Sequence, residues 1–148
     1  MTAARWIATA GPVGHWPWGP GTLASALVAV LWWRLPTAGW VWLAGVAAVT
    51  AAGLVAAGRA ETELGRDDGR IVIDEVAGMG LASIAVPHTL AGAGIALALF
   101  RVLDIWKPPP IGRAQNLPGG WGVMAYDLAA GAAAALVAGL GLALWPWA

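Results

Sequence analysis

Long apolar runs separated by prolines constrain this chain more than any other feature of its sequence. Pro36, Pro87 and the run Pro108–Pro110 stand where a helix cannot continue. Five helices are predicted between these breaks, over residues Thr22–Leu35, Gly39–Gly58, Ile71–Val86, Leu90–Trp106 and Trp121–Trp145. Because 59% of the residues are hydrophobic and only 11% are charged, we expect an integral membrane protein.

The predicted fold class is an all-α, membrane-embedded helical bundle that forms a single domain over residues 1–148. A helix needs about 20 residues to cross the hydrocarbon core, so the first predicted helix is short and either borrows from its Trp-rich lead-in or re-enters. We therefore expect about five helices, of which four to five span. The small residues of Ala129–Gly141 permit close helix packing, within one subunit or in a homo-oligomer.

Charge and cysteine content exclude several classes of function. The formal net charge is zero and no basic tail is present, so nucleic acid is not expected as a partner. The absence of cysteine excludes disulfides, thiol catalysis and thiolate metal sites. The first residues lack an apolar core, so we do not expect a cleaved signal peptide.

The charged residues also predict how the bundle is oriented. If the first predicted helix runs outward and the others alternate, every basic residue except Arg34 falls on one side of the membrane. An excess of Lys and Arg marks the cytoplasmic side. All the acidic residues fall on that same side, so any site that they form is expected there.

Two polar stretches near this face have both a structural and a functional explanation. Residues 19–25, GPGTLAS, form a turn before a helix with Thr22 as the expected N-cap, where backbone N–H groups favour a phosphate. A capped helix without a ligand is the simpler explanation of this stretch alone. Asp74 and Glu75 begin the helix at Ile71, where they either cap it or form a functional site at membrane depth.

The third polar stretch, FRVLDIWKPPP at 100–110, spaces Arg101, Asp104 and Lys107 three residues apart. In a helix these positions share a face. A salt bridge with Lys107 reaching the interface would account for them. Two cations beside a carboxylate also suit a phosphate next to a metal ion.

The carboxylates of these stretches predict a magnesium site. They provide oxygen ligands without a His or Cys set, which suits Mg²⁺ and not Zn²⁺. His15 and His88 are predicted on opposite faces, so they cannot share a site. The expected ligands are Asp74, Glu75, Asp104 and Asp127. The residues therefore indicate metal-assisted phosphate chemistry on a substrate at the cytoplasmic leaflet.

Together these stretches resemble the phosphatidylglycerophosphatase A family, membrane phosphatases of bacterial phospholipid biosynthesis. The matching segments are PGT at 20–22 with Ser25 beyond it, IVIDEVAGM at 71–79, FRVLDIWKPPPI at 100–111, and GGWGVM at 119–124 with DLAAG at 127–131. The resemblance implies Mg²⁺-dependent hydrolysis of phosphatidylglycerophosphate to phosphatidylglycerol and phosphate. It also implies a multi-pass protein of the bacterial inner membrane with its active site on the cytoplasmic side and a phospholipid substrate from that leaflet.

We expect the following roles for the candidate residues. Asp67 is a further metal ligand beside the four carboxylates above. Arg101 and Lys107 bind the phosphate and act in catalysis together with Asp104 and Glu75. The start of the first helix adds phosphate contacts from Gly21, Thr22 and Ser25. Attack by water and initial attack by an Asp are both open.

Two positions depart from the family pattern and leave alternatives. Tyr126 replaces the first of two adjacent Asp residues, and Ala114 stands where an Asp is usual. A lost carboxylate predicts weaker metal binding, a shifted substrate, or a relative that binds lipid phosphate without hydrolysing it. A small transporter or channel subunit is the other alternative, although its polar groups should lie near the midplane. The DDGR at 67–70 only superficially resembles a CDP-alcohol phosphotransferase motif.

Overall fold

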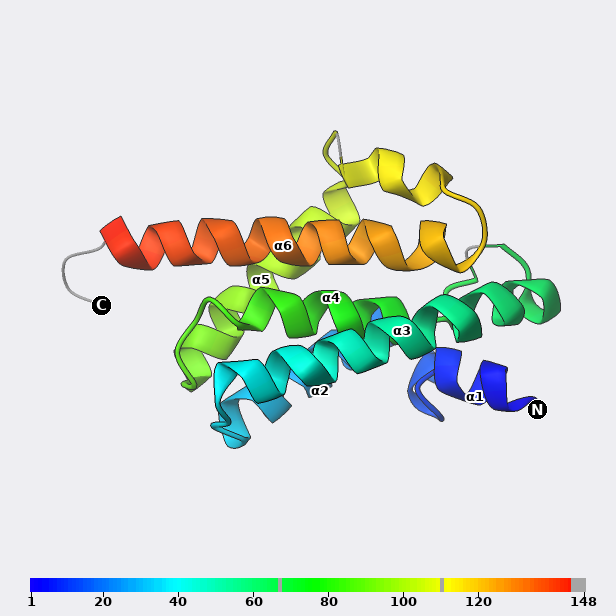
Figure 1. Cartoon of the computed structure of the whole chain (residues 1–148), viewed down its shortest axis with the longest axis horizontal. Helices are drawn as coiled ribbons and strands as arrows, with labels where there is room; N and C mark the ends of the chain where they lie inside the picture. The colour runs from blue at the N-terminus through cyan, green and yellow to red at the C-terminus, as the bar shows by residue number, and fades with distance from the viewer. Residues whose placement is uncertain (67, 110, 145–148) are drawn as a thin grey trace.

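The computed structural model describes residues 1–66, 68–109 and 111–144, and within these ranges the chain is helical without strands (Figure 1). The all-α prediction is therefore confirmed. The elements in chain order are α1 (Ala3–Ala8), the 3₁₀ helix η1 (Val13–His15), α2 (Pro20–Arg34), α3 (Gly39–Leu64), α4 (Ile73–Ser83), α5 (Leu90–Trp106), the 3₁₀ helix η2 (Ile111–Asn116) and α6 (Gly120–Leu144).

The five predicted helices are present as α2 to α6, with differences at their ends. Thr22 is not the N-cap of α2, because the helix already begins at Pro20. Gly19 takes the cap position with a φ of 64°, a left-handed conformation that glycine adopts without strain, and proline suits the first helical position. The short α1 was not predicted. Its first turn is capped by Thr2, whose side chain accepts a hydrogen bond from the backbone N–H of Arg5.

The central helix of the bundle is α4, against which α2, α3, α5 and α6 all pack (Figure 1). Its closest neighbour is α6, because glycines on both helices let the two backbones touch. A Cβ atom on Gly131 would lie 2.2 Å from the carbonyl oxygen of Gly78, and one on Gly78 would lie 2.5 Å from the carbonyl oxygen of Asp127. This contact places the first half of α6 beside the first half of α4.

Within the described ranges, α3 and α6 are the helices long and apolar enough to cross a membrane, judged by length and composition. Many large apolar side chains on the outside of the bundle are exposed, whereas the interior is built mostly from alanine around Phe100, Met79 and Met124. By contrast α4 has 11 residues and is about 16 Å long, too short for a straight span. An arrangement with four to five spanning helices stays a prediction.

Several connections lie toward the two ends of the long axis (Figure 1). The N-terminus, the α3–α4 loop and the start of α6 share one end, and the α2–α3 and α4–α5 connections share the other. At the first end the N-terminal segment fixes the α3–α4 loop. The backbone N–H of Val72 donates to the carbonyl oxygen of Ala8 at 2.9 Å, and a Cβ on Gly14 would lie 2.0 Å from the carbonyl oxygen of Arg70.

Candidate metal and phosphate site

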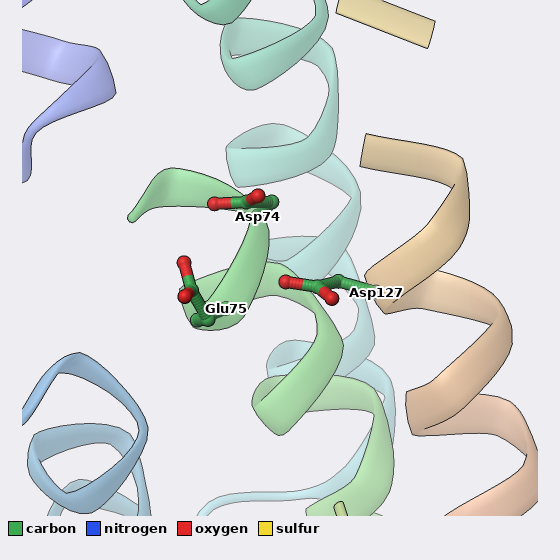
Figure 2. A group of neighbouring side chains, drawn as sticks. All are labelled: Asp74, Glu75 and Asp127. Atoms are coloured by element: carbon green, nitrogen blue, oxygen red, sulfur yellow. The ribbon is translucent and has the colours of Figure 1, made fainter. Parts of the chain in front are cut away.

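Three carboxylates converge at the N-terminal end of α4 (Figure 2). Asp74 and Glu75 come from the first turn of α4, and Asp127 points toward them from α6. Each of the three offers an oxygen atom that lies within 4.8 Å of those of the other two. We call Asp74, Glu75 and Asp127 the carboxylate trio. The glycine contact between α4 and α6 explains why residues so distant in sequence meet here.

The trio fits a hard divalent cation. Among the described residues, no hydrogen-bond partner reaches the buried atoms Asp74 Oδ1, Glu75 Oε2 and Asp127 Oδ1. Buried carboxylate oxygens without partners are costly, and neighbouring negative charges repel. Three oxygen donors without nitrogen or sulfur suit Mg²⁺ or Ca²⁺, and a cation of either kind would relieve both costs.

Arg101 on α5 lies beside the trio and has a donor to spare. Its Nη1 donates to Asp104 Oδ2 and lies 4.0 Å from Glu75 Oε1. Its Nε is buried and has no hydrogen-bond partner among the described residues. A guanidinium group with an unused N–H next to a cation site is well suited to a phosphate oxygen.

Asp104 is nearly buried and lies outside the trio, with both of its carboxylate oxygens already bonded. Arg101 donates to Oδ2, and the hydroxyl of Tyr126 donates to Oδ1 at 3.0 Å. Lys107 follows the last residue of α5 as a C-cap with a φ of 52°, so the expected helical stripe ends at Asp104. The Nζ of Lys107 still lies close, 4.7 Å from the centre of the Tyr126 ring.

A cavity of about 320 Å³ connects the trio with Asp104, Lys107 and Tyr126, whereas Arg101 lies behind Asp104 and Glu75 and is not among the described residues that line it. That volume is at the lower end of the range for small-molecule pockets. The trio, Asp104, Lys107 and Tyr126 line it together with further polar residues. These are Glu61 of α3, Arg66 and Asp68 of the α3–α4 loop, and Asn116 of η2. No local spacing marks these residues or the Tyr126 hydroxyl, so the sequence did not predict roles for them.

The start of α2 contacts the site in an unexpected way. A Cβ on Gly21 would lie 1.9 Å from Glu75 Oε1, so this glycine leaves room for the Glu75 carboxylate. The hydroxyl of Ser25 is buried and donates to the carbonyl oxygen of Gly21 at 2.8 Å, while Thr22 is exposed. The structure does not bring Gly21, Thr22 or Ser25 into the described wall of the cavity. A carboxylate near a helix N-terminus is favoured by the helix dipole.

Asp68 borders the cavity from the α3–α4 loop and is paired with Arg70. The Nε of Arg70 donates to Asp68 Oδ1 and its Nη2 donates to Oδ2, both at 2.7 Å. These hydrogen bonds hold the pKa of Asp68 at about 2, below its usual 3.8. Asp67, the further predicted metal ligand, lies outside the described residues.

The remaining singled-out residues do not line the described wall of the cavity. His88 lies at the opposite end of the bundle, stacked on Trp32 with 3.7 Å between ring centres. Its Nδ1 donates to the carbonyl oxygen of Trp32 at 2.6 Å. His15 is exposed at the end of η1, and Ala114 belongs to η2.

A family model and one of two similar proteins carry the same family name. A sequence model of the family described as Phosphatidylglycerophosphatase A matches residues 6–142. A protein of Bacteroides thetaiotaomicron named "Putative phosphatidylinositol-3-phosphatase" is 35% identical over 138 residues, which cover 84% of each chain. The Phosphatidylglycerophosphatase A of Escherichia coli K12 is 31% identical over 116 residues, 76% of this chain and 67% of that protein. No solved structure matches significantly.

Proposed function

Because the chain belongs to the phosphatidylglycerophosphatase A family, we propose that it is a Mg²⁺-dependent lipid phosphatase that converts phosphatidylglycerophosphate to phosphatidylglycerol and phosphate. One observation supports this most strongly. Buried carboxylate oxygens without partners lie in the same site as a buried guanidinium nitrogen without a partner, among the residues described. Phosphoryl transfer needs both, a set of ligands for a hard cation and a donor for phosphate oxygens.

The proposed roles divide the site between two sides. The carboxylate trio binds Mg²⁺, which when bound supplies Lewis acidity and compensates the charge of the phosphate. Arg101 and Lys107 bind the phosphate oxygens from the other side. Asp104 retains unused lone pairs beyond its two hydrogen bonds, so it orients the attacking water and accepts its proton. This proposal takes Asp104 out of the predicted metal ligands and keeps it among the predicted catalytic groups.

We further propose that the protein is embedded in the bacterial inner membrane, with α2, α3, α5 and α6 crossing around the short α4. The exposed apolar side chains on these helices support this placement. Most of the basic residues lie toward the end that holds the cavity, so this end faces the cytoplasm. The phospholipid substrate then reaches the cavity from the cytoplasmic leaflet.

Phosphatidylinositol 3-phosphate is the second candidate substrate, because the relative that is 35% identical carries the name of a phosphatase for that lipid. Both lipids present a phosphomonoester, so the same trio and cations would serve either. The difference lies in the alcohol next to the phosphate, glycerol in one and inositol in the other. Glu61 of α3 and Asn116 of η2 line the same cavity, and we propose that they contact this alcohol.

Phosphate release from the two lipids by the purified protein tests the proposal. We expect release from phosphatidylglycerophosphate that requires Mg²⁺, stops with a chelator, and is faster than release from phosphatidylinositol 3-phosphate. Asp74→Asn serves as the control for a contaminating phosphatase. Faster release from the inositol lipid would assign that substrate instead. Release from neither lipid would favour the binding-only or transport alternative.

A further inference from the structure

Tyr126 on α6 contacts two proposed catalytic side chains, one from α5 and one from its C-cap residue. Its hydroxyl donates to Asp104 Oδ1 at 3.0 Å, and its ring lies 4.7 Å below the Nζ of Lys107. Tyr126 is only 6% exposed and Asp104 only 8%. A hydrogen bond to a carboxylate is stronger when water is excluded, as it is between Tyr126 and Asp104. Lys107 is exposed, so its cation–π contact is the weaker of the two.

The hydroxyl contact fixes Asp104 in a way that Arg101 cannot. Arg101 precedes Asp104 by one turn of the same helix, so their ion pair does not constrain the position of α5 relative to α6. The bond from Tyr126 crosses between the two helices. The next residue, Asp127, belongs to the carboxylate trio. Because neighbouring residues of a helix point about 100° apart, position 126 faces α5 while position 127 faces α4.

Lys107 depends on support from outside its own helix. It has a φ of 52°, in the left-handed region that is unfavourable for a residue with a side chain. The Tyr126 ring is one of the contacts that hold its ammonium group near the cavity. A single side chain of α6 therefore touches both the carboxylate and the ammonium group that α5 contributes.

We infer that Tyr126 is a positioning residue, whose hydroxyl aims Asp104 and whose ring aims Lys107 at a phosphate bound next to the trio. The inference rests on the proposed function, since it assigns both partners to the chemistry of one phosphate. Its two contacts can be separated by substitution. Tyr126→Phe removes the hydroxyl and keeps the ring, whereas Tyr126→Leu removes both.

The test measures kcat, KM and the inhibition constant of inorganic phosphate for both variants. For Tyr126→Phe we expect kcat to fall about tenfold or more, with KM and the phosphate constant changed less than about twofold. For Tyr126→Leu we expect the same loss of kcat and, in addition, phosphate binding weakened about threefold or more. If Tyr126 had only a structural role, both variants would yield less folded protein, and the folded fraction would keep the wild-type kcat and phosphate affinity.

Ser83→Ala is the matched control. The Ser83 hydroxyl is also buried and donates to the carbonyl oxygen of Met79 at 2.8 Å, at the other end of α4. We expect this variant to keep the wild-type kcat. Wild-type kcat in folded Tyr126→Phe would overturn the role of the hydroxyl, and equal phosphate affinity in the two Tyr126 variants would overturn the role of the ring. If Tyr126→Leu does not fold, Tyr126→Phe alone still tests the role of the hydroxyl. The inhibition constant of inorganic phosphate for Lys107→Met then tests whether Lys107, the residue that the ring contacts, binds the phosphate.

A failure of the proposed function would be recognised separately. If the wild-type protein hydrolyses neither lipid, calorimetric binding of inorganic phosphate in the presence of Mg²⁺ replaces the kinetic measurement. Weaker binding by Tyr126→Leu than by Tyr126→Phe would then support the positioning of Lys107 in a protein that is not this enzyme. Equal binding by the two variants, or no phosphate binding by the wild type, would overturn the positioning role.

Discussion

The buried and half-buried polar groups near the two ends of α4 differ in whether they have hydrogen-bond partners. Near the C-terminal end, Ser83, His88 and Trp42 all donate to backbone carbonyl oxygens of neighbouring turns and helices, and Trp32 Nε1 is the buried exception there. At the N-terminal end, three carboxylate oxygens and Arg101 Nε have no partner among the described residues, and neither has Arg5 Nε on the neighbouring α1. Most polar groups at the C-terminal end thus have hydrogen-bond partners within the chain, whereas those at the N-terminal end are expected to find theirs in a ligand.

This difference separates stability from activity. Groups that the chain satisfies internally contribute to the free energy of unfolding, so their removal should destabilise the fold and spare the chemistry. Groups left without partners cost stability in the absence of a ligand, so their removal should spare the fold and stop the chemistry. The predictions below test this contrast.

The largest effect is expected for Asp127→Asn. The substitution removes one negative charge from the trio while keeping the size of the side chain, so Mg²⁺ is bound more weakly. The negative charge of the phosphate is then less well stabilised in the transition state. We expect phosphate release from phosphatidylglycerophosphate to fall at least about a hundredfold, with helicity unchanged by circular dichroism. Activity within about threefold of wild type would show that Asp127 is not a ligand that catalysis needs.

The second largest effect is expected for Gly131→Ala, which inserts a methyl group where α4 and α6 touch. That Cβ would lie 2.2 Å from a carbonyl oxygen of α4, so the helices must separate. We expect a loss of about 1–3 kcal/mol in the free energy of unfolding and a loss of activity as well, because the same contact brings Asp127 to Asp74.

Gly141→Ala on the same helix is the control, since, apart from its own turn of helix, no atom of the described residues lies within 4 Å of its added Cβ. This variant should be as stable as wild type or more stable, because alanine favours the helix. Equal stability of the two glycine variants in denaturant unfolding would show that the helices do not approach this closely.

The helices could be predicted from the sequence because apolar runs and prolines are local signals. The convergence of the trio was only partly predictable. The topology predicted from the charges puts Asp74, Glu75 and Asp127 on one face. Their meeting depends on the backbone contact at Gly78 and Gly131, which no spacing encodes. The short α1 was missed because it has too few residues to show a period.

The role of Tyr126 could not be predicted for a related reason. In the sequence, Tyr126 is notable only because the family pattern has an Asp at this position. Whether position 126 faces the trio or faces α5 depends on the rotation of α6 about its axis, which tertiary packing sets. The structure turns it toward Asp104, so the substitution changes a neighbour of Asp104 and leaves the three convergent carboxylates in place.

A smaller effect is expected for Trp42→Phe at the far end of α4. The Nε1 of Trp42 donates to the carbonyl oxygen of Gly80 at 2.8 Å, and phenylalanine cannot replace that bond. We expect a loss of about 1 kcal/mol in the free energy of unfolding while kcat stays at the wild-type value. A large fall in kcat without loss of stability would contradict the contrast between the two ends.

The smallest effect concerns Asp68 and pH. Its pKa is about 2 in the folded protein against 3.8 ordinarily, so the folded state binds fewer protons there. The stabilisation by Arg70 is therefore complete above pH 3.8 and disappears as the pH falls through about 2. The difference in unfolding temperature between wild type and Asp68→Asn should shrink over this interval. A constant difference would show that the pair does not contribute.

The most direct test of the central claim is thermal unfolding of the purified protein during a titration with Mg²⁺ in the absence of substrate. The account predicts that Mg²⁺ raises the Tm of wild type and of Ser83→Ala by binding the folded state. It predicts no rise for Asp74→Asn or Asp127→Asn, and a metal-free Tm for these variants equal to or above that of wild type. A wild-type Tm that does not respond to Mg²⁺, or an equal response in the Asp variants, would contradict it.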